Sequence, residues 1–144
     1  MSFREKSAWI MLIMIVVMTS LWTAHMAWWR PSMLAPDPNP FVFHTLILTT
    51  VGFVVIVVVA HIVIAVMAPR DANARADERE RLIGLKATRI GAYVYAGLSL
   101  SSIFIIHLGA NEIGLAYFLL YSFAIAEAVN YAARIVYYRR GVGP

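Results

Sequence analysis

Residues 69–89 read PRDANARADERERLIGLKATR, and this charged segment decides the fold. It contains half of the Lys and Arg residues of the chain, namely Arg70, Arg75, Arg79, Arg81, Lys86 and Arg89. Two long apolar blocks precede the segment and two follow it. Positive charge next to apolar blocks orients helices in a membrane, so we expect this segment to set the orientation of the whole chain.

The composition indicates an integral membrane protein. The 144 residues are 61% hydrophobic and 14% charged, and the mean hydropathy is +0.73. Soluble domains carry about 25% charged residues, and a chain of this length is usually one domain. The net charge of +4 lies beside apolar blocks, which argues against direct nucleic-acid binding. The absence of cysteine excludes disulfides and thiolate sites.

Four apolar blocks are long enough to cross a bilayer, which takes about 20 helical residues. The predicted spans are 7–27, 42–68, 87–107 and 113–138, with an outer proline-rich loop at 28–41 and a cytoplasmic charged loop at 69–86. The second block is rich in β-branched residues, but a strand with an unpaired edge is not stable in lipid. We therefore predict an all-α polytopic membrane protein, a four-transmembrane-helix bundle forming one domain, 1–144.

The basic residues predict the orientation. All of the twelve Lys and Arg residues except Arg30 fall on the side of the two termini and the charged segment. Lys and Arg accumulate in cytoplasmic loops. Both termini are therefore predicted to be cytoplasmic.

Small residues four positions apart let helices approach closely in lipid. Four such groups are predicted to lie at helix interfaces: Ala87/Gly91, Ala92/Ala96, Gly97/Ser101 and Ala124/Ala128/Ala132. Helical periodicity also places polar residues on one face of the fourth span, and this face is predicted to point inward.

Glu127 lies in the middle of the fourth span, where an ionised carboxylate is costly unless it is paired or protonated. Asn130 and Arg134 share its face, and His61 lies at a similar depth on the second span. We predict that these four residues form a polar intramembrane centre. Two interpretations stay open: a network that fixes helix register, or a proton-sensitive, ligand-binding or transport site.

Three histidines fall near the outer ends of the spans: His25, His44 and His107. Imidazoles, with Asp37 and Glu112 in the outer loops, suit zinc, copper or iron, and paired imidazoles can hold haem. The alternative is that these histidines simply occupy a half-polar interfacial zone. The identity of any cofactor stays unknown at this stage.

The charged segment is a candidate docking surface for a partner with both charge signs, or a solvated helix start with internal pairing. The candidate residues are Arg75, Asp77, Glu78, Arg79, Glu80, Arg81 and Arg89. The sequence contains no phosphate-binding glycine loop, nucleophile elbow or metalloprotease motif, so we expect no enzyme activity.

Residues 77–83, DERERLI, followed by Lys86, Arg89 and Ile90, resemble a group of small bacterial four-span membrane proteins with an Asp-Glu-Arg run in the central loop. Residues 3–9 and 127–140 also fit this resemblance. Some members are encoded beside small helix-turn-helix regulators. The resemblance implies a bacterial inner membrane and a regulatory partner, but assigns no residue roles.

These observations favour a small non-enzymatic bacterial inner membrane protein that binds a cytoplasmic regulatory partner through the charged loop. Two alternatives remain: a metal- or haem-binding membrane protein that uses the outer histidines, and a small transporter subunit centred on Glu127. A homodimer is compatible with the sequence.

Overall fold

The computed structural model describes residues 3–33, 39–67 and 77–141, and these residues form four long α-helices. The helices are α1 (Phe3–Met33), α2 (Phe41–Met67), α4 (Glu78–His107) and α5 (Glu112–Arg140). Each is long and apolar enough to cross a membrane. The predicted all-α fold with four spans is confirmed, and the chain is a multi-pass membrane protein by this criterion.

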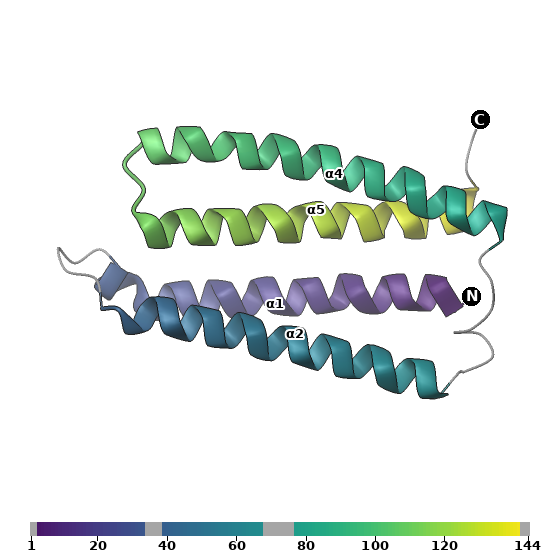
Figure 1. Ribbon diagram of the computed structural model, residues 1–144, viewed down its shortest axis with the longest axis horizontal. Coiled ribbons are helices and arrows are strands. Elements are labelled where there is room, and N and C mark those ends of the chain that lie inside the picture. Colours follow the sequence, from purple (N-terminus) through teal and green to yellow (C-terminus); the bar gives the residue numbers. More distant parts are fainter. Residues whose placement is uncertain (1–2, 34–38, 68–76, 142–144) are drawn as a thin grey trace.

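The helices lie side by side in the order α4, α5, α1, α2 and alternate in direction (Figure 1). Contact is most extensive between α4 and α5, less so between α1 and α5, and least between α1 and α2. The start of α1, the end of α2, the start of α4 and the end of α5 share one end of the molecule (Figure 1). We call this end the charged end.

Side-chain caps and one glycine define the helix ends. Asp77 caps α4 by accepting a hydrogen bond from the backbone N–H of Glu80, and Asn111 caps α5 through the N–H of Gly114. Between these helices Gly109 has a φ of 86°, a left-handed conformation that favours glycine. Helix α1 continues through Pro31 to Met33, so the loop after it begins later than the predicted residue 28.

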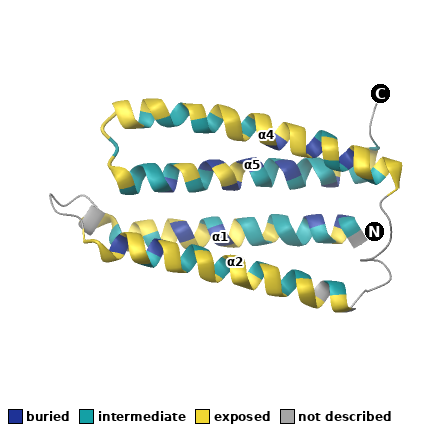
Figure 2. Cartoon of the chain, viewed as in Figure 1, coloured by how far each residue is buried: buried dark blue, intermediate teal, exposed yellow. Residues whose placement is uncertain are grey.

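Burial is concentrated on α5 and on the faces that contact it (Figure 2). One apolar cluster joins three helices: Met18, Trp22, Leu46, Tyr117 and Ala124. Among the described side chains of α2, only those of Val42 and Leu46 are buried. The remaining apolar surface of α2 and the outer face of α4 are suited to contact with lipid.

The small-residue prediction is confirmed on one face of α4 and wrong on another. Ala87 and Gly91 are buried. A Cβ atom on Gly91 would lie 3.0 Å from the carbonyl oxygen of Ala126 and 3.0 Å from the Cβ of Asn130. Ala92 and Ala96 are exposed, and a Cβ on Gly97 would meet no atom within 4 Å. Helix α4 has one large contact, with α5, so it uses one stripe of small residues for packing within the chain.

Candidate functional site

A hydrogen-bonded chain of polar side chains runs along α5 and crosses to α4. Asn130 Nδ2 donates to Glu127 Oε2 at 3.2 Å, and Arg134 Nε donates to Asn130 Oδ1 at 3.2 Å. Arg134 Nη2 then donates to Thr88 Oγ1 on α4, also at 3.2 Å. Asn130 is 5% exposed and therefore connects the carboxylate and the guanidinium from within the α4–α5 interface.

Glu127 and Arg134 interact through Asn130 rather than directly. Within the described part of the chain the two side chains form no ion pair, and the guanidinium carbon of Arg134 lies 5.2 Å from the centre of the Tyr131 ring. Glu127 is half-buried. Three of the four residues predicted for the polar centre are thus brought together, and they can hold a proton or fix the packing of α5 on α4.

His61, the fourth predicted member, is not brought into this network. Its Nδ1–H donates to the carbonyl oxygen of Val57 on its own helix at 2.9 Å. The reason is the order of the helices, because α1 lies between α2 and α5 (Figure 1).

His25 joins three helices. Its Nε2 is 2.8 Å from Thr45 Oγ1 on α2, and its Nδ1 is hydrogen-bonded to the hydroxyl of Tyr117 on α5. The Thr45 hydroxyl donates to the carbonyl of Phe41 at 2.8 Å, so the Nε2–H of a neutral His25 donates to Thr45 and the Tyr117 hydroxyl donates to Nδ1. Both ring nitrogens are therefore occupied by protein groups.

The predicted metal site of His25, His44 and His107 does not form. Among the residues that the structure describes, no group of three His, Asp or Glu side chains could hold a metal ion. His44 Nδ1–H donates to the carbonyl of Pro40 at 2.8 Å, and His107 lies exposed in the last turn of α4. His44 belongs to α2 and His107 to α4, and α1 and α5 lie between these two helices (Figure 1). Asp37 lies outside the described residues.

Sequence reasoning missed two contacts beside His25. Trp22 Nε1–H donates to Thr50 Oγ1 at 3.1 Å, and the hydroxyls of Thr23 and Tyr121 are 2.6 Å apart. The rings of Trp22 and Tyr121 also meet edge to face at 5.9 Å. A usable signal existed, since the indole N–H of a buried Trp usually finds a hydrogen-bond partner.

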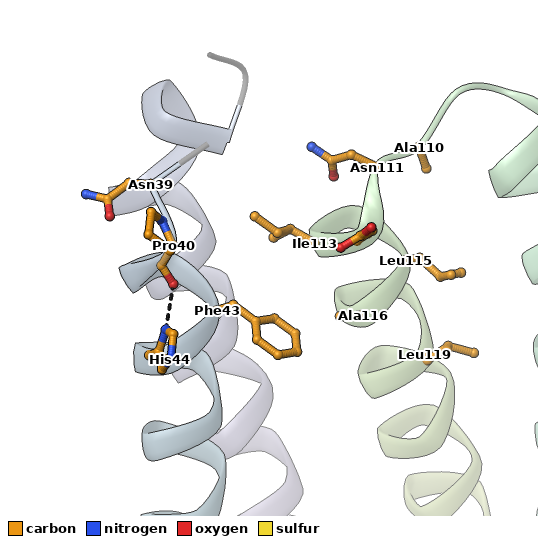
Figure 3. Close-up of a pocket in the computed structure, with 11 residues that line it drawn as sticks. Asn39, Pro40, Phe43, His44, Ala110, Asn111, Ile113, Leu115, Ala116 and Leu119 are labelled. Carbon is orange, nitrogen blue, oxygen red and sulfur yellow. Dashed lines mark hydrogen bonds between the residues drawn. The ribbon is translucent and has the colours of Figure 1, made fainter. Parts of the chain in front are cut away.

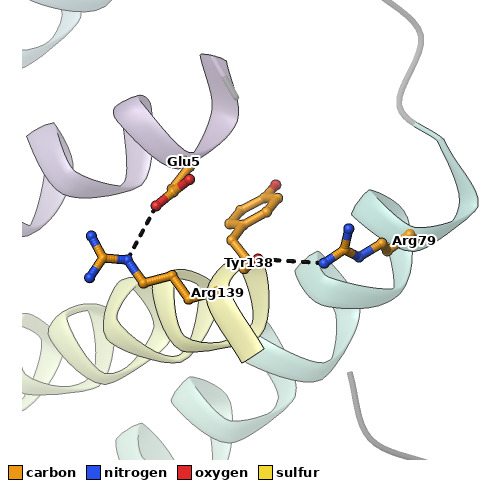
Figure 4. Close-up of polar contacts among 4 residues, drawn as sticks. All are labelled: Glu5, Arg79, Tyr138 and Arg139. Carbon is orange, nitrogen blue, oxygen red and sulfur yellow. Dashed lines mark hydrogen bonds and ion pairs between the residues drawn. The ribbon is translucent and has the colours of Figure 1, made fainter. Parts of the chain in front are cut away.

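At the charged end, three interactions tie α1, α4 and α5 together. Arg139 Nε on α5 lies 3.4 Å from Glu5 Oε1 on α1, and Arg79 Nη2 on α4 donates to the carbonyl of Tyr138 at 3.4 Å (Figure 4). Arg4 Nε also lies 3.1 Å from Glu80 Oε2, joining α1 to α4. Glu5 is only 9% exposed, so part of the charge at this end is structural.

The predicted docking residues therefore divide into two groups. Four of them interact within the chain: Asp77 as a cap, Arg79 and Glu80 as above, and Arg89 through the Tyr93 hydroxyl at 3.3 Å. Glu78 and Arg81 are exposed, and their side chains form no hydrogen bond or ion pair within the described ranges. Arg75 lies outside the described residues.

Two grooves lined by described residues open at the other end of the molecule, and neither was predicted. The larger, which we call the α2–α5 groove, has a volume of about 1100 Å³ and lies between the starts of α2 and α5 (Figure 3). The smaller lies between the end of α1 and the start of α5 and contains Arg30, Thr23 and Tyr117.

In comparisons with family models, curated proteins and solved structures, nothing matches this chain. The resemblance based on residues 77–83 therefore stays a prediction. The function is therefore inferred from the contacts and grooves of the structure.

Proposed function

We propose that this protein is a small non-enzymatic protein of a bacterial inner membrane that binds a cytoplasmic partner protein through the start of α4. The docking face consists of Glu78, Arg81, Leu82 and Leu85. One observation carries the proposal: the Leu85 side chain is 71% exposed near the start of the 30-residue helix α4.

The docking face is one side of α4. Its residues follow the i, i+3, i+4, i+7 spacing of a single helix face. The opposite side, with Ile83, Ala87 and Gly91, is buried. Leu82 is 44% exposed, so two leucines and two charges face away from the rest of the chain.

The length of α4 supports a position outside the hydrocarbon. Its 30 residues extend about 45 Å, whereas the hydrocarbon core is about 30 Å thick. If the span ends at His107, about 20 residues counted back from that point reach Thr88. The docking face then lies in the headgroup zone or beyond it, where the two leucines have no hydrocarbon to cover them.

The chemistry of the face favours one kind of partner. Glu78 and Arg81 present one negative and one positive charge. Leu82 and Leu85 present an apolar surface on the membrane side of these charges. An amphipathic helix of a partner protein, with an apolar stripe flanked by an acidic and a basic residue, complements this face.

The proposed side of the membrane follows from the positive charge. Every described Lys and Arg except Arg30 belongs to the half of a helix nearest the charged end. The positive-inside rule favours the cytoplasm for that end, and with it for both termini. The bacterial inner membrane itself is proposed from the resemblance of residues 77–83.

Photo-crosslinking in intact cells tests the proposal. A benzophenone amino acid replaces Leu85, and the matched control replaces Leu100, which is 66% exposed on the same helix at hydrocarbon depth. We expect Leu85 to yield a discrete protein adduct and Leu100 to yield none. The adduct should be lost when Glu78→Arg and Arg81→Glu are combined, because both charges are then inverted.

Two results would sink the proposal. One is a crosslinker at position 85 that reacts with lipid alone. The other is a protein adduct that survives the inversion of both charges, since the contact would then not depend on the docking face.

A further inference from the structure

We infer that the α2–α5 groove binds a phospholipid whose headgroup carries a primary ammonium group. The groove lies at the end of the molecule opposite the charged end, so this inference is independent of the partner-binding proposal. It is based on four properties of the groove: its lining, its hydrogen-bonding capacity, its charge and its depth.

The lining is polar at the rim and apolar below. Asn39, His44, Asn111 and Glu112 supply the polar groups. Phe43 of α2 and Ile113 of α5 point toward each other across the groove (Figure 3). A molecule with a polar head and an apolar chain fits this division.

Two of these polar groups, His44 on one wall and Glu112 on the other, can act as acceptors, whereas the side-chain amides of Asn39 and Asn111 also carry N–H donors. His44 Nδ1–H donates to the carbonyl of Pro40, so the Nε2 atom of the neutral ring carries a lone pair. Glu112, on the opposite wall, is a carboxylate and accepts only. Two acceptors with one negative charge are complemented by a cation that carries N–H donors.

The start of α2 complements the second half of the same headgroup. The first turn of α2 contains no acidic residue, whereas the first turn of α5 contains Glu112. No carboxylate therefore offsets the positive end of the α2 dipole, where Asn39 Oδ1 accepts a hydrogen bond from the N–H of Phe41, and this end favours the lipid phosphate. Ammonium and phosphate are neighbours in a zwitterionic headgroup, and Glu112 and the first turn of α2 both line this groove.

The depth of the groove matches a phospholipid. Along α5 the lining runs from Glu112 to Leu119, which is about 10 Å at 1.5 Å per residue. The rim of the groove includes Glu112, the first residue of α5, and therefore lies at the level of the lipid headgroups. The lower end of the groove lies at the level of the hydrocarbon. An acyl chain can therefore continue from the groove along Phe43 and Ala116 into the bilayer.

The smaller groove provides a contrast within the same molecule. It contains Arg30 and no carboxylate among its lining residues. A lipid with a net negative charge is therefore expected to prefer that groove. The two sites can be distinguished by their response to Glu112→Gln.

Native mass spectrometry of the full chain tests the inference. The protein is released from detergent after incubation with phosphatidylethanolamine, phosphatidylcholine or phosphatidylglycerol of identical acyl chains, and bound lipids are counted. We expect phosphatidylethanolamine to bind roughly fivefold more tightly than phosphatidylcholine, which has the same charges but no N–H donor. Glu112→Gln should remove this preference and leave phosphatidylglycerol binding unchanged. Glu78→Gln, at the charged end, is the control.

Two outcomes would overturn the inference. The first is equal binding of the ethanolamine and choline lipids by the unaltered protein. The second is a preference for ethanolamine that persists in Glu112→Gln, which would assign it to a different surface. Circular dichroism of each variant establishes that the helices are intact before either result is used.

Discussion

Helices α4 and α5 form the best-packed pair in this molecule, whereas α2 packs least although it is the most apolar span. The α4–α5 pair meets at Gly91, closely enough that an added Cβ would touch the backbone of α5, and the polar chain from Glu127 to Thr88 crosses the same interface. Helix α2 buries only Val42 and Leu46 among its described side chains.

The difference shows what holds helices together in lipid. Apolar side chains gain nothing there by leaving lipid for protein, so the long β-branched stretch of α2 provides length but little association. Close backbone approach and hydrogen bonds do provide association. Helix α2 has such bonds near its start, from Trp22 to Thr50 and from His25 to Thr45. Three substitutions test this contrast.

The largest effect is expected at Gly91. Gly91→Ala places a methyl group 3.0 Å from the carbonyl oxygen of Ala126 and should destabilise the protein by about 1–3 kcal/mol. The measurement is reversible unfolding in mixed detergent micelles, followed by circular dichroism. Gly97→Ala is the matched control on the same helix, because its new methyl meets nothing within 4 Å. Equal stability of the two variants would contradict the packing described for α4 and α5.

A smaller effect is expected at Asn130. Asn130→Leu keeps the size of the side chain but removes the donor to Glu127 and the acceptor for Arg134, which should cost about 1 kcal/mol. His61→Leu on α2 should have almost no effect, because the His61 side chain bonds only within its own helix in the described chain. If His61→Leu proves to be the more destabilising variant in the same unfolding assay, α2 makes contacts that this account does not include.

The smallest effect is expected at Thr50. Thr50→Val preserves shape and removes the acceptor of the Trp22 indole, which should cost about 0.6 kcal/mol. Thr49→Val is the neighbouring control, since among the described residues Thr49 donates only to the carbonyl of Thr45 in its own helix. Tryptophan fluorescence should shift in Thr50→Val and stay constant in Thr49→Val. A shift in both variants would mean that tryptophan fluorescence reports a general change in α2 and not the loss of the hydrogen bond between Trp22 and Thr50.

Hydropathy and periodicity predicted the four helices because lipid permits few alternatives to a helix. The same reasoning placed Asn130 and Arg134 beside Glu127, since they lie three and seven residues away on one helix. It also predicted the burial of Ala87 and Gly91. These predictions depend on local spacing, which the sequence contains directly.

The predictions that failed depended on the order of the helices. His25, His44 and His107 lie at similar depths, but depth does not say which helices are neighbours, and two helices separate α4 from α2. His61 is separated from Glu127 in the same way. The α2–α5 groove was missed for the same reason, because its walls come from residues about 70 positions apart in the sequence.

The most direct test of the whole account is the accessibility of the two ends of α4. The chain has no cysteine, so Glu78→Cys and Leu108→Cys each introduce a single thiol. A maleimide that cannot cross the inner membrane is added to cells whose outer membrane has been opened. The account predicts labelling at position 108 and none at position 78 until the inner membrane is broken. Labelling at position 78 in sealed cells would contradict it.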